Sequence, residues 1–290
     1  MNIAVCSIQK NRGPWLVEWV AFHHLVGVTD FVLYMHECSD DTHEVVAALQ
    51  KLFRIRAFAL NDIDFAPQLR CYAHACQEFV DRFDWMAFLD GDEFLFPTRE
   101  RSLQQTLARY QSLEISALAP YWRCFGSAGH VSEPQGLITQ NYQRASAPDF
   151  EANHHVKSII RGGAKPRVTN NSHYFLTEKG SFDEHLHPVT APFDMGRRPS
   201  WDHLRINHYV TQSREYFEKV KQASGAADAG PKALRSLEWW TKHDRNDVHD
   251  TSMQPFAAPL AALVDGICAA TGLGRRHIGG MPRWAAPAAG

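Results

Sequence analysis

Short apolar runs alternate with longer amphipathic segments through the first third of the chain. The runs predict four strands, at Ile3 to Ile8, Asp30 to His36, Arg54 to Leu60 and Trp85 to Leu89. Between them, apolar positions recur at helical spacing and predict helices from Pro14 to Gly27, over 41–52 and from Pro67 to Phe83. This βαβαβαβ order indicates a parallel sheet covered by helices on both faces.

The alternation fades in the later part of the chain. The pattern predicts a helix over 102–112 and a strand over 115–121, followed by an irregular stretch rich in Gly, His, Asn and Pro, which is typical of acceptor-binding loops. Helical character returns over 213–223 and 255–271, with a flexible connection at 224–231. We expect one domain over 1–275, made of two halves (1–100 and 101–275), and a disordered tail over 276–290.

Three acids follow directly after the fourth predicted strand. Asp90, Asp92 and Glu93 should lie at the carboxyl edge of the sheet, where open α/β sheets bind ligands. Acids two apart in an extended segment point the same way, so Asp90 and Asp92 could together hold a hard divalent cation that binds a diphosphate. The alternative is a solvated turn. The buried strand before the acids and the aromatic residues after them favour the metal site.

Composition excludes some functions. The chain has 290 residues, 44% of them hydrophobic, which suits a large globular core. A net charge of -2 and a pI of about 6.8 argue against nucleic-acid binding. No apolar run approaches the roughly 20 residues that span a bilayer, and the first residues lack a basic leader. We expect a cytoplasmic protein without a transmembrane segment, which leaves peripheral membrane association open. Six cysteines without Cys-x-x-Cys pairing indicate reduced thiols.

Several blocks, in order over roughly residues 3 to 265, resemble glycosyltransferase family 92 and the related family 2-like glycosyltransferases. They are Lys10-Asn11, Leu16-x-Glu18-Trp19-Val20-Ala-x-His23, Gly27-Val28-x-Asp30-x-Val32-x-Tyr34, Ser39-Asp40-x-Thr42, Trp85-x-x-Phe88-Leu89-Asp90-x-Asp92-Glu93-Phe94, Trp122-x-x-Phe125-Gly126-Ser127-x-Gly129, Val156-Lys157-Ser158-Ile159, Ile206-Asn207-His208-Tyr209 and Asp244-x-Asn246-x-Val248-x-Asp250.

The resemblance implies a GT-A (Rossmann-like) fold, α/β in class, with a mostly parallel central sheet. It makes 1–100 the nucleotide-binding half and 101–275 the irregular acceptor-side half. It also implies a nucleotide-sugar donor, for which we expect a UDP-sugar, and Mn²⁺ or Mg²⁺ as cofactor. The expected function is an inverting hexosyltransferase that acts on a glycan or polysaccharide acceptor. A cation bound by Asp90 and Asp92 would stabilise the charge that develops on the diphosphate leaving group.

Donor binding is expected at the ends of the first two strands. Lys10 and Asn11 can approach the ribose or phosphate, and Asp40 can accept hydrogen bonds from the base or ribose, next to Asp90. Each assignment has a rival. Lys10 could be a solvated turn cation, and Asp40 could cap the helix that follows it.

A histidine is expected to complete the metal shell. GT-A enzymes commonly supply one from the later part of the chain, and the Ile-Asn-His-Tyr match selects His208 to join Asp90 and Asp92. His173 is the competing candidate, because either imidazole could bind a cation.

The sugar or acceptor side is expected to involve six residues: Glu93, Trp122, Phe125, Gly126, Lys157 and His173. Trp122 offers a ring face on which a sugar can stack, with core packing as its alternative. Lys157 could contact phosphate or acceptor, or could be a strand-edge lysine. An inverting transfer needs a carboxylate base, but no motif selects among the candidates Asp149, Glu151, Asp183 and Glu184.

Two departures from the family pattern bear on activity. Arg12 stands where the family commonly has an acid, and Met35-His36-Glu37 replaces a common Asp-Asn pair. Two other functions stay open, and these departures support only the second of them. One is a nucleotidyltransferase or phosphohydrolase that uses the same metal site. The other is a catalytically silent carbohydrate-binding or scaffold protein of the same fold.

Overall fold

The first half of the computed structural model alternates strands with helices, and the structure describes residues 1–61, 65–222 and 235–284. The elements are β1 (Ile3–Gln9), α1 (Gly13–Leu25), β2 (Asp30–His36), α2 (Thr42–Leu49), β3 (Ile55–Leu60), α3 (Pro67–Glu78), the 3-10 turn η1 (Val80–Arg82) and β4 (Trp85–Phe88). The predicted βαβαβαβ order is confirmed.

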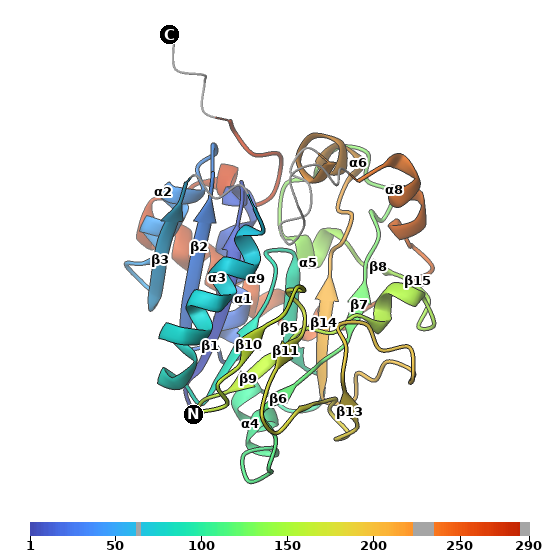
Figure 1. The fold of residues 1–290 in the computed structure, drawn as a ribbon. Helices are drawn as coiled ribbons and strands as arrows, with labels where there is room; N and C mark the ends of the chain where they lie inside the picture. Colours follow the sequence, from blue (N-terminus) through green and yellow to red (C-terminus); the bar gives the residue numbers. More distant parts are fainter. Residues whose placement is uncertain (62–64, 223–234, 285–290) are drawn as a thin grey trace.

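One sheet of eight strands runs in the order β13-β12-β6-β9-β4-β1-β2-β3. The strands of its second half are short: β6 (Ala117–Leu118), β9 (Ile159–Arg161), β12 (Ser181–Phe182) and β13 (Pro188–Val189). β1 pairs in parallel with β2 and β4, and β2 with β3, whereas β9 runs antiparallel between β4 and β6. The expected α/β class, with a mostly parallel central sheet flanked by helices, is confirmed (Figure 1).

Helices cover both faces of this sheet because alternate strand residues point to opposite sides. Ile3 and Val5 of β1 belong to the core that includes α1, α2 and the last helix, α9 (Gln254–Thr271), whereas Ala4 and Cys6 belong to the core that includes α3. α1 is apolar on nearly every side, because it lies between the sheet and α9, as expected for an interior helix.

A second sheet of three strands joins the two halves of the chain. Its order is β5 (Glu93–Pro97), β14 (Leu204–His208) and β7 (Trp122–Cys124), with β14 in the middle (Figure 1). β14 runs antiparallel to β5 and parallel to β7. In this register His208 pairs with Glu93, the first residue after the Asp90-Gly-Asp92 turn. The pairing therefore brings a late histidine to the predicted metal motif.

The remaining elements are short and connect irregularly. They are α4 (Leu103–Ala108), α5 (Ile138–Asn141), β8 (Arg144–Ala145), η2 (Glu151–His154), β10 (Arg167–Val168), β11 (Phe175–Leu176), α6 (Arg214–Tyr216), the π-helical turn η3 (Phe217–Lys221), α8 (Leu237–His243), β15 (Val248–His249) and η4 (Arg275–His277). The helix predicted over 102–112 and the strand over 115–121 are both found, but shorter. The expected connection at 224–231 lies outside the described residues.

Residues 276–280, which the sequence analysis assigned to a disordered tail, instead pack against the first half of the chain. His277 is buried and its Nε2 lies 3.2 Å from Asp41 Oδ2. The amides of Gly279 and Gly280 donate to the carbonyls of Pro14, at 2.7 Å, and Pro134, at 2.8 Å. That expectation is wrong for these residues, because backbone pairing holds them. Residues 285–290 lie outside the described residues, and the division of 1–275 into two functional halves remains a prediction.

Candidate active site

The Asp90-Gly91-Asp92-Glu93 segment forms a closed turn between β4 and β5. The amide of Asp90 donates to Glu93 Oε2 at 2.8 Å, and the amide of Glu93 donates to the carbonyl of Asp90 at 3.1 Å. Gly91 packs closely against the neighbouring strand, because a Cβ there would lie 2.4 Å from Gln9 Oε1. Asp90 and Asp92 both line a cavity of about 370 Å³.

Asp90 is held by a buried lysine. Lys157 Nζ lies 3.1 Å from Asp90 Oδ1 and 3.5 Å from Glu93 Oε2, and its side chain is fully buried. Burial raises the pKa of Glu93 to about 8. Burial alone would lower the pKa of Lys157, but the carboxylates of Asp90 and Glu93 outweigh burial and raise this pKa above its ordinary value. Lys157 is therefore the cation that neutralises Asp90 from inside the protein, and it is not a strand-edge lysine.

Asp92 has a different partner at each oxygen. Oδ1 lies 3.6 Å from His208 Nε2, and Oδ2 accepts a hydrogen bond of 2.7 Å from Lys221 Nζ. Burial alone would raise the pKa of Asp92, but Lys221 and His208 hold this pKa well below its ordinary value. Burial lowers the pKa of His208, so its imidazole is neutral near pH 7. An ionised carboxylate beside a neutral imidazole is a donor pair that suits a divalent cation.

Lys221 was missed by the sequence analysis. It ends the π-helical turn Phe217–Lys221, 129 residues after Asp92, in a stretch without a recognisable motif. Its ammonium also donates to the carbonyl of Val210 and lies 6.0 Å from the ring centre of Trp239. Only the packing of this turn over the acids reveals it as part of the site.

Trp122 lines the same cavity and is surrounded by imidazoles. Its ring centre lies 4.1 Å from that of His208, 4.9 Å from that of His173 and 4.8 Å from that of His155, with which it stacks at 24°. Burial lowers the pKa of His173 well below its ordinary value, and His173 Nδ1 has no hydrogen-bond partner among the described residues. His155 is a further cavity residue that no motif indicated.

Arg12, the main departure from the family pattern, is a buried connector. Its guanidinium donates to the carbonyl of Gly91 at 2.9 Å, to Gln212 Oε1 at 2.8 Å and to the hydroxyl of Tyr216 at 2.7 Å. It also lies 4.4 Å from the ring centre of Trp15. Arg12 thus ties the acidic turn to the segment that precedes Lys221, which is a role that builds the site.

An ion pair and hydrogen bonds connect the loop after β1 to the loop after β2. Lys10 lines the cavity and pairs with Glu37 at 2.7 Å. Asn11 Oδ1 accepts from the amides of Ser39, at 2.7 Å, and Asp40, at 3.3 Å.

Asp40 accepts hydrogen bonds at the starts of two helices. Its oxygens accept from the amide of Gly13 at 3.0 Å and from the amide and hydroxyl of Thr42 at 3.0 and 2.6 Å. These hydrogen bonds support the capping interpretation of Asp40. Among the described residues, neither Asn11 nor Asp40 lines the cavity.

The loop after Trp122 is clamped by the Asp244-x-Asn246 block. Asp244 Oδ1 accepts from the amide of Ser127 at 2.6 Å, and Asn246 Oδ1 accepts from the amide of Ala128 at 2.7 Å. Phe125 is buried in the core, and a Cβ on Gly126 would lie 2.4 Å from the carbonyl oxygen of Arg245. Of the expected sugar or acceptor residues, Trp122 and His173 line the cavity, and Phe125 and Gly126 do not.

The four acids considered as catalytic bases are scattered. Asp149 and Glu151 are exposed, and Glu151 lies 3.1 Å from Lys242 Nζ and lines a smaller cavity of about 260 Å³. That cavity shares Ala152, His155 and His243 with the larger one, so Glu151 borders the site. Asp183 accepts from the amides of His185 and His187, both at 2.9 Å, and its contacts hold its own loop.

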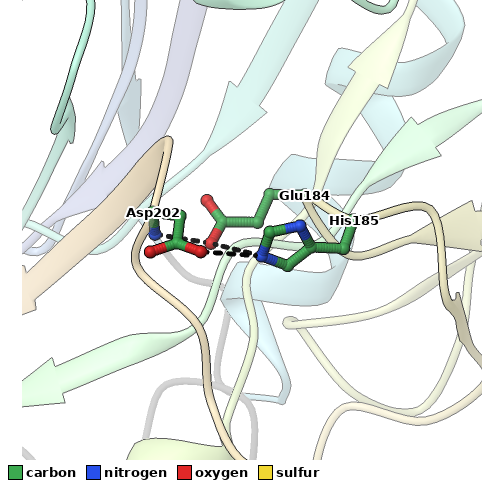
Figure 2. Close-up of side chains that lie close together, drawn as sticks. All are labelled: Glu184, His185 and Asp202. Carbon is green, nitrogen blue, oxygen red and sulfur yellow. Dashed lines mark hydrogen bonds and ion pairs between the residues drawn. The ribbon is translucent and has the colours of Figure 1, made fainter.

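Glu184 belongs to a cluster that resembles a metal site in composition. Among the described residues, Glu184, His185 and Asp202 are the one group in which three potential ligand atoms lie within 4.8 Å of one another (Figure 2). Both oxygens of Glu184 are, however, already occupied. They accept from the hydroxyl of Ser200 and from the amides of Asp202, His203 and Leu204, the last three at 2.6, 2.7 and 2.7 Å.

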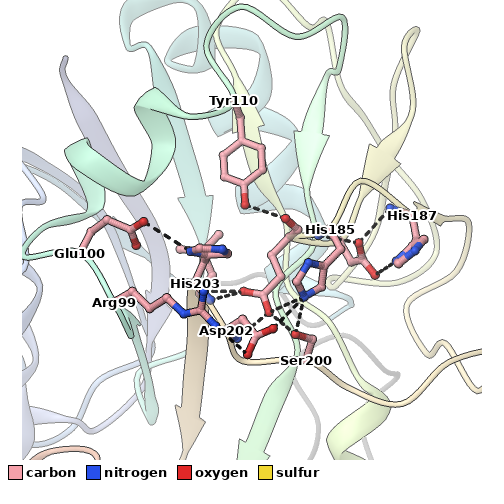
Figure 3. Close-up of polar contacts among 11 residues, drawn as sticks. Arg99, Glu100, Tyr110, His185, His187, Ser200, Asp202 and His203 are labelled. Carbon is pink, nitrogen blue, oxygen red and sulfur yellow. Dashed lines mark hydrogen bonds and ion pairs between the residues drawn. The ribbon is translucent and has the colours of Figure 1, made fainter.

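The backbone of Glu184 is held as well, because the hydroxyl of Tyr110 donates to its carbonyl at 2.8 Å (Figure 3). A carboxylate with four protein donors has little capacity left for a cation or for a substrate proton. Glu184 therefore holds the start of β14, the strand that delivers His208 at its other end.

Comparison with known proteins identifies relatives of the chain. The family model for glycosyltransferase family 92 matches residues 2–195. A family 92 protein of rice (Oryza sativa subsp. japonica) is 27% identical over 75% of this chain and 34% of its own length. One from Arabidopsis thaliana is 24% identical over 87% of this chain and 45% of its own. The chain thus spans a third to a half of the length of these curated relatives.

Solved structures are more distant. Staphylococcus aureus TarS residues 1–349 in complex with UDP gives a TM-score of 0.39 at 12% identity, covering 57% of this chain and 48% of that one. Glucosyl-3-phosphoglycerate synthase of Mycobacterium tuberculosis, with Mn²⁺, UDP and phosphoglyceric acid, gives 0.30 at 12% identity over 42% and 43%. In the part of the chain that the structure describes, no helix has the length and apolar character to span a bilayer.

The occupied Glu184 carboxylate leads to a stability prediction. Glu184→Ala leaves four donors without an acceptor, and two of them, the amides of His203 and Leu204, are buried. The mutation should lower the free energy of unfolding by about 3 kcal/mol, because an unsatisfied buried donor costs about 1–3 kcal/mol. His185→Ala, at a half-exposed position, should change it by less than about 0.5 kcal/mol. Urea denaturation measures both. If added Mn²⁺ or Zn²⁺ stabilises the wild type and His185→Ala abolishes that gain, the cluster is a metal site and this interpretation is wrong.

Proposed function

Because the chain belongs to glycosyltransferase family 92, we propose that it transfers a sugar from a nucleotide-diphosphate sugar to a glycan or polysaccharide acceptor with the help of a divalent cation. The observation that carries this proposal is the Asp92 carboxylate, which lies at the sheet edge in a cavity with a neutral histidine on one side and a lysine on the other. A UDP-sugar is the proposed donor.

The residues present fit a cation of this kind. Asp92 Oδ1 and His208 Nε2 are 3.6 Å apart, and His208 Nδ1 has no hydrogen-bond partner among the described residues. Asp92 and His208 would hold Mn²⁺ or Mg²⁺, with Asp90 beside them at the same cavity. When bound, the cation neutralises the diphosphate leaving group.

The chain's own residues supply the other requirements of a transfer. Lys10, Lys221 and Arg235 line the cavity and favour the anionic diphosphate. The rings of Trp122, His155 and His173 pack together and form an aromatic wall of the cavity, against which a sugar ring can lie. Among the four acids considered, Glu151 borders the cavity, and we propose it as the base that removes the acceptor proton in an inverting transfer of a hexose.

The alternative functions have less support. A two-metal nucleotidyltransferase or phosphohydrolase needs more clustered acids than the pair at this cavity. A silent binding protein was suggested by Arg12 and by Met35-His36-Glu37. The contacts of Arg12 instead hold the acidic turn, and Glu37 pairs with Lys10 of the cavity. Assays of donor hydrolysis separate the three: free sugar with nucleoside diphosphate indicates transfer, pyrophosphate release indicates nucleotidyl chemistry, and no reaction indicates a binding protein. A cytoplasmic location, with peripheral membrane contact left open, is part of the same proposal.

The metal assignment predicts that Asp92→Asn binds cation and nucleoside diphosphate far more weakly. The amide keeps the size of the side chain but loses the charge, so activity should fall by orders of magnitude. The mutation also leaves Lys221 without its carboxylate, so some loss of stability is expected. Calorimetric titration of the folded variant with Mn²⁺ and UDP measures the effect, with the exposed Asp265→Asn as the control. Equally tight, metal-independent binding in Asp92→Asn would refute the assignment.

The two histidines should give opposite signatures. His208→Ala should raise the Mn²⁺ concentration needed for half-maximal donor hydrolysis without acceptor, because it removes a ligand from beside Asp92. His173→Ala should leave that midpoint in place and alter acceptor kinetics. A wild-type midpoint in His208→Ala with a raised midpoint in His173→Ala would reverse the assignment.

Asp40 is proposed to contact the nucleoside in addition to capping. Asp40→Ala should raise the donor KM more than it lowers kcat, if the contact is equal in the ground and transition states. It should also cost about 1 kcal/mol of stability through the lost cap. Thr42→Ala, which removes part of the cap and keeps the carboxylate, is the control. Lower stability with unchanged donor affinity in Asp40→Ala would leave only the structural role.

A further inference from the structure

Lys221 occupies a position at the cavity that the proposed metal site alone does not explain. Its ammonium hydrogen-bonds Asp92 Oδ2 at 2.7 Å, on the oxygen opposite the one near His208. Its side chain is only 11% exposed. Burying an ammonium is costly unless a carboxylate compensates it. In the structure, therefore, Asp92 and Lys221 neutralise each other.

The ammonium has capacity for one more partner. A lysine has three N–H donors, and two of those of Lys221 go to Asp92 Oδ2 and the carbonyl of Val210. Among the described residues no third acceptor is recorded for it, and Lys221 lines the cavity. One donor can thus be offered to a ligand oxygen in the cavity.

The other cations near the acids are differently engaged. Lys157 contacts Asp90 and Glu93 from the buried side, and Lys10 pairs with Glu37 at 2.7 Å near the surface. Arg235 also lines the cavity, and its Nη1 donates to the backbone carbonyl of Lys221 at 3.3 Å. Lys221 is the lysine that shares a carboxylate with the proposed cation.

Sharing one carboxylate has opposite consequences for cation and diphosphate. A divalent ion held by Asp92 and His208 would share the Asp92 carboxylate with the Lys221 ammonium, and two positive groups on one carboxylate repel each other strongly where water is scarce. A diphosphate reverses this repulsion, because its oxygens can bind both positive groups at once.

We propose that Lys221 is a second, protein-supplied cation of the donor site: it neutralises Asp92 in the free enzyme and donates to a diphosphate oxygen when the donor and its divalent cation bind. This inference rests on the proposed function. It assigns Lys221 as a donor-binding residue, and it makes the cation and the diphosphate bind cooperatively, each weakly without the other.

The test uses Mn²⁺ and inorganic pyrophosphate, a probe that does not depend on the nucleotide base. In Lys221→Met, calorimetry should show pyrophosphate binding in the presence of Mn²⁺ weakened about tenfold, the effect of one charge-assisted contact. Binding of Mn²⁺ alone should become several-fold tighter, because its competitor for Asp92 is gone. Lys219→Met is the matched control, since Lys219 is exposed and pairs with Glu215 on the same segment, and it should change neither.

The opposite signs separate this role from a structural one. If Lys221→Met weakens both ligands together, or leaves pyrophosphate binding unchanged, the inference is overturned while the proposed function stands. If the wild type with Mn²⁺ binds neither pyrophosphate nor UDP, the donor chemistry fails and the inference fails with it. Should Lys221→Met not fold, Lys221→Gln with the same pair of titrations gives the same discrimination.

Discussion

The site depends on the antiparallel pairing of β5 with β14. β5 begins at Glu93, directly after the Asp90-Gly-Asp92 turn, and β14 ends at His208. Backbone hydrogen bonds between these strands fix the register, and a slip by one residue would turn the His208 side chain to the other face of the sheet. Glu184 accepts four hydrogen bonds at the other end of β14 and so holds that strand in place. A structural carboxylate thereby positions a side chain at the cavity.

Charge balance is the second constraint on this region. Two acids that border the cavity and a third, Glu93, lie close together, and such a group would repel itself in a medium of low dielectric constant. Lys157 neutralises Asp90 from the interior, and Lys221 neutralises Asp92 from the cavity. The two lysines are not equivalent, because a ligand can reach Lys221 but not the fully buried Lys157. Each of the two acids at the cavity therefore faces a lysine before any ligand arrives.

Arg12 shows how a departure from a family pattern can be structural. As a residue of the loop after β1 it would be expected near the donor, yet its guanidinium spans from the carbonyl of Gly91 to Tyr216. It therefore connects the acidic turn, the first strand loop and the segment that leads to Lys221. Asn11 makes a similar connection on the other side, where a positive φ of 53° aims its side chain at the amides of Ser39 and Asp40.

The sequence by itself determined the first half of the fold and the position of the acids. Apolar runs and helical spacing are local signals, so they predicted the βαβαβαβ order and located Asp90 and Asp92 at the end of β4. Resemblance to family 92 added His208. The tertiary structure alone decided which distant residues join the acids, because pairing between β5 and β14 and packing of the π-helical turn are not encoded in any local pattern. Lys221 and His155 were missed for this reason, and Glu184 changed from a base candidate to an anchor of β14. The donors that occupy the Glu184 carboxylate come from Ser200 to Leu204, and only the folded chain brings them to it.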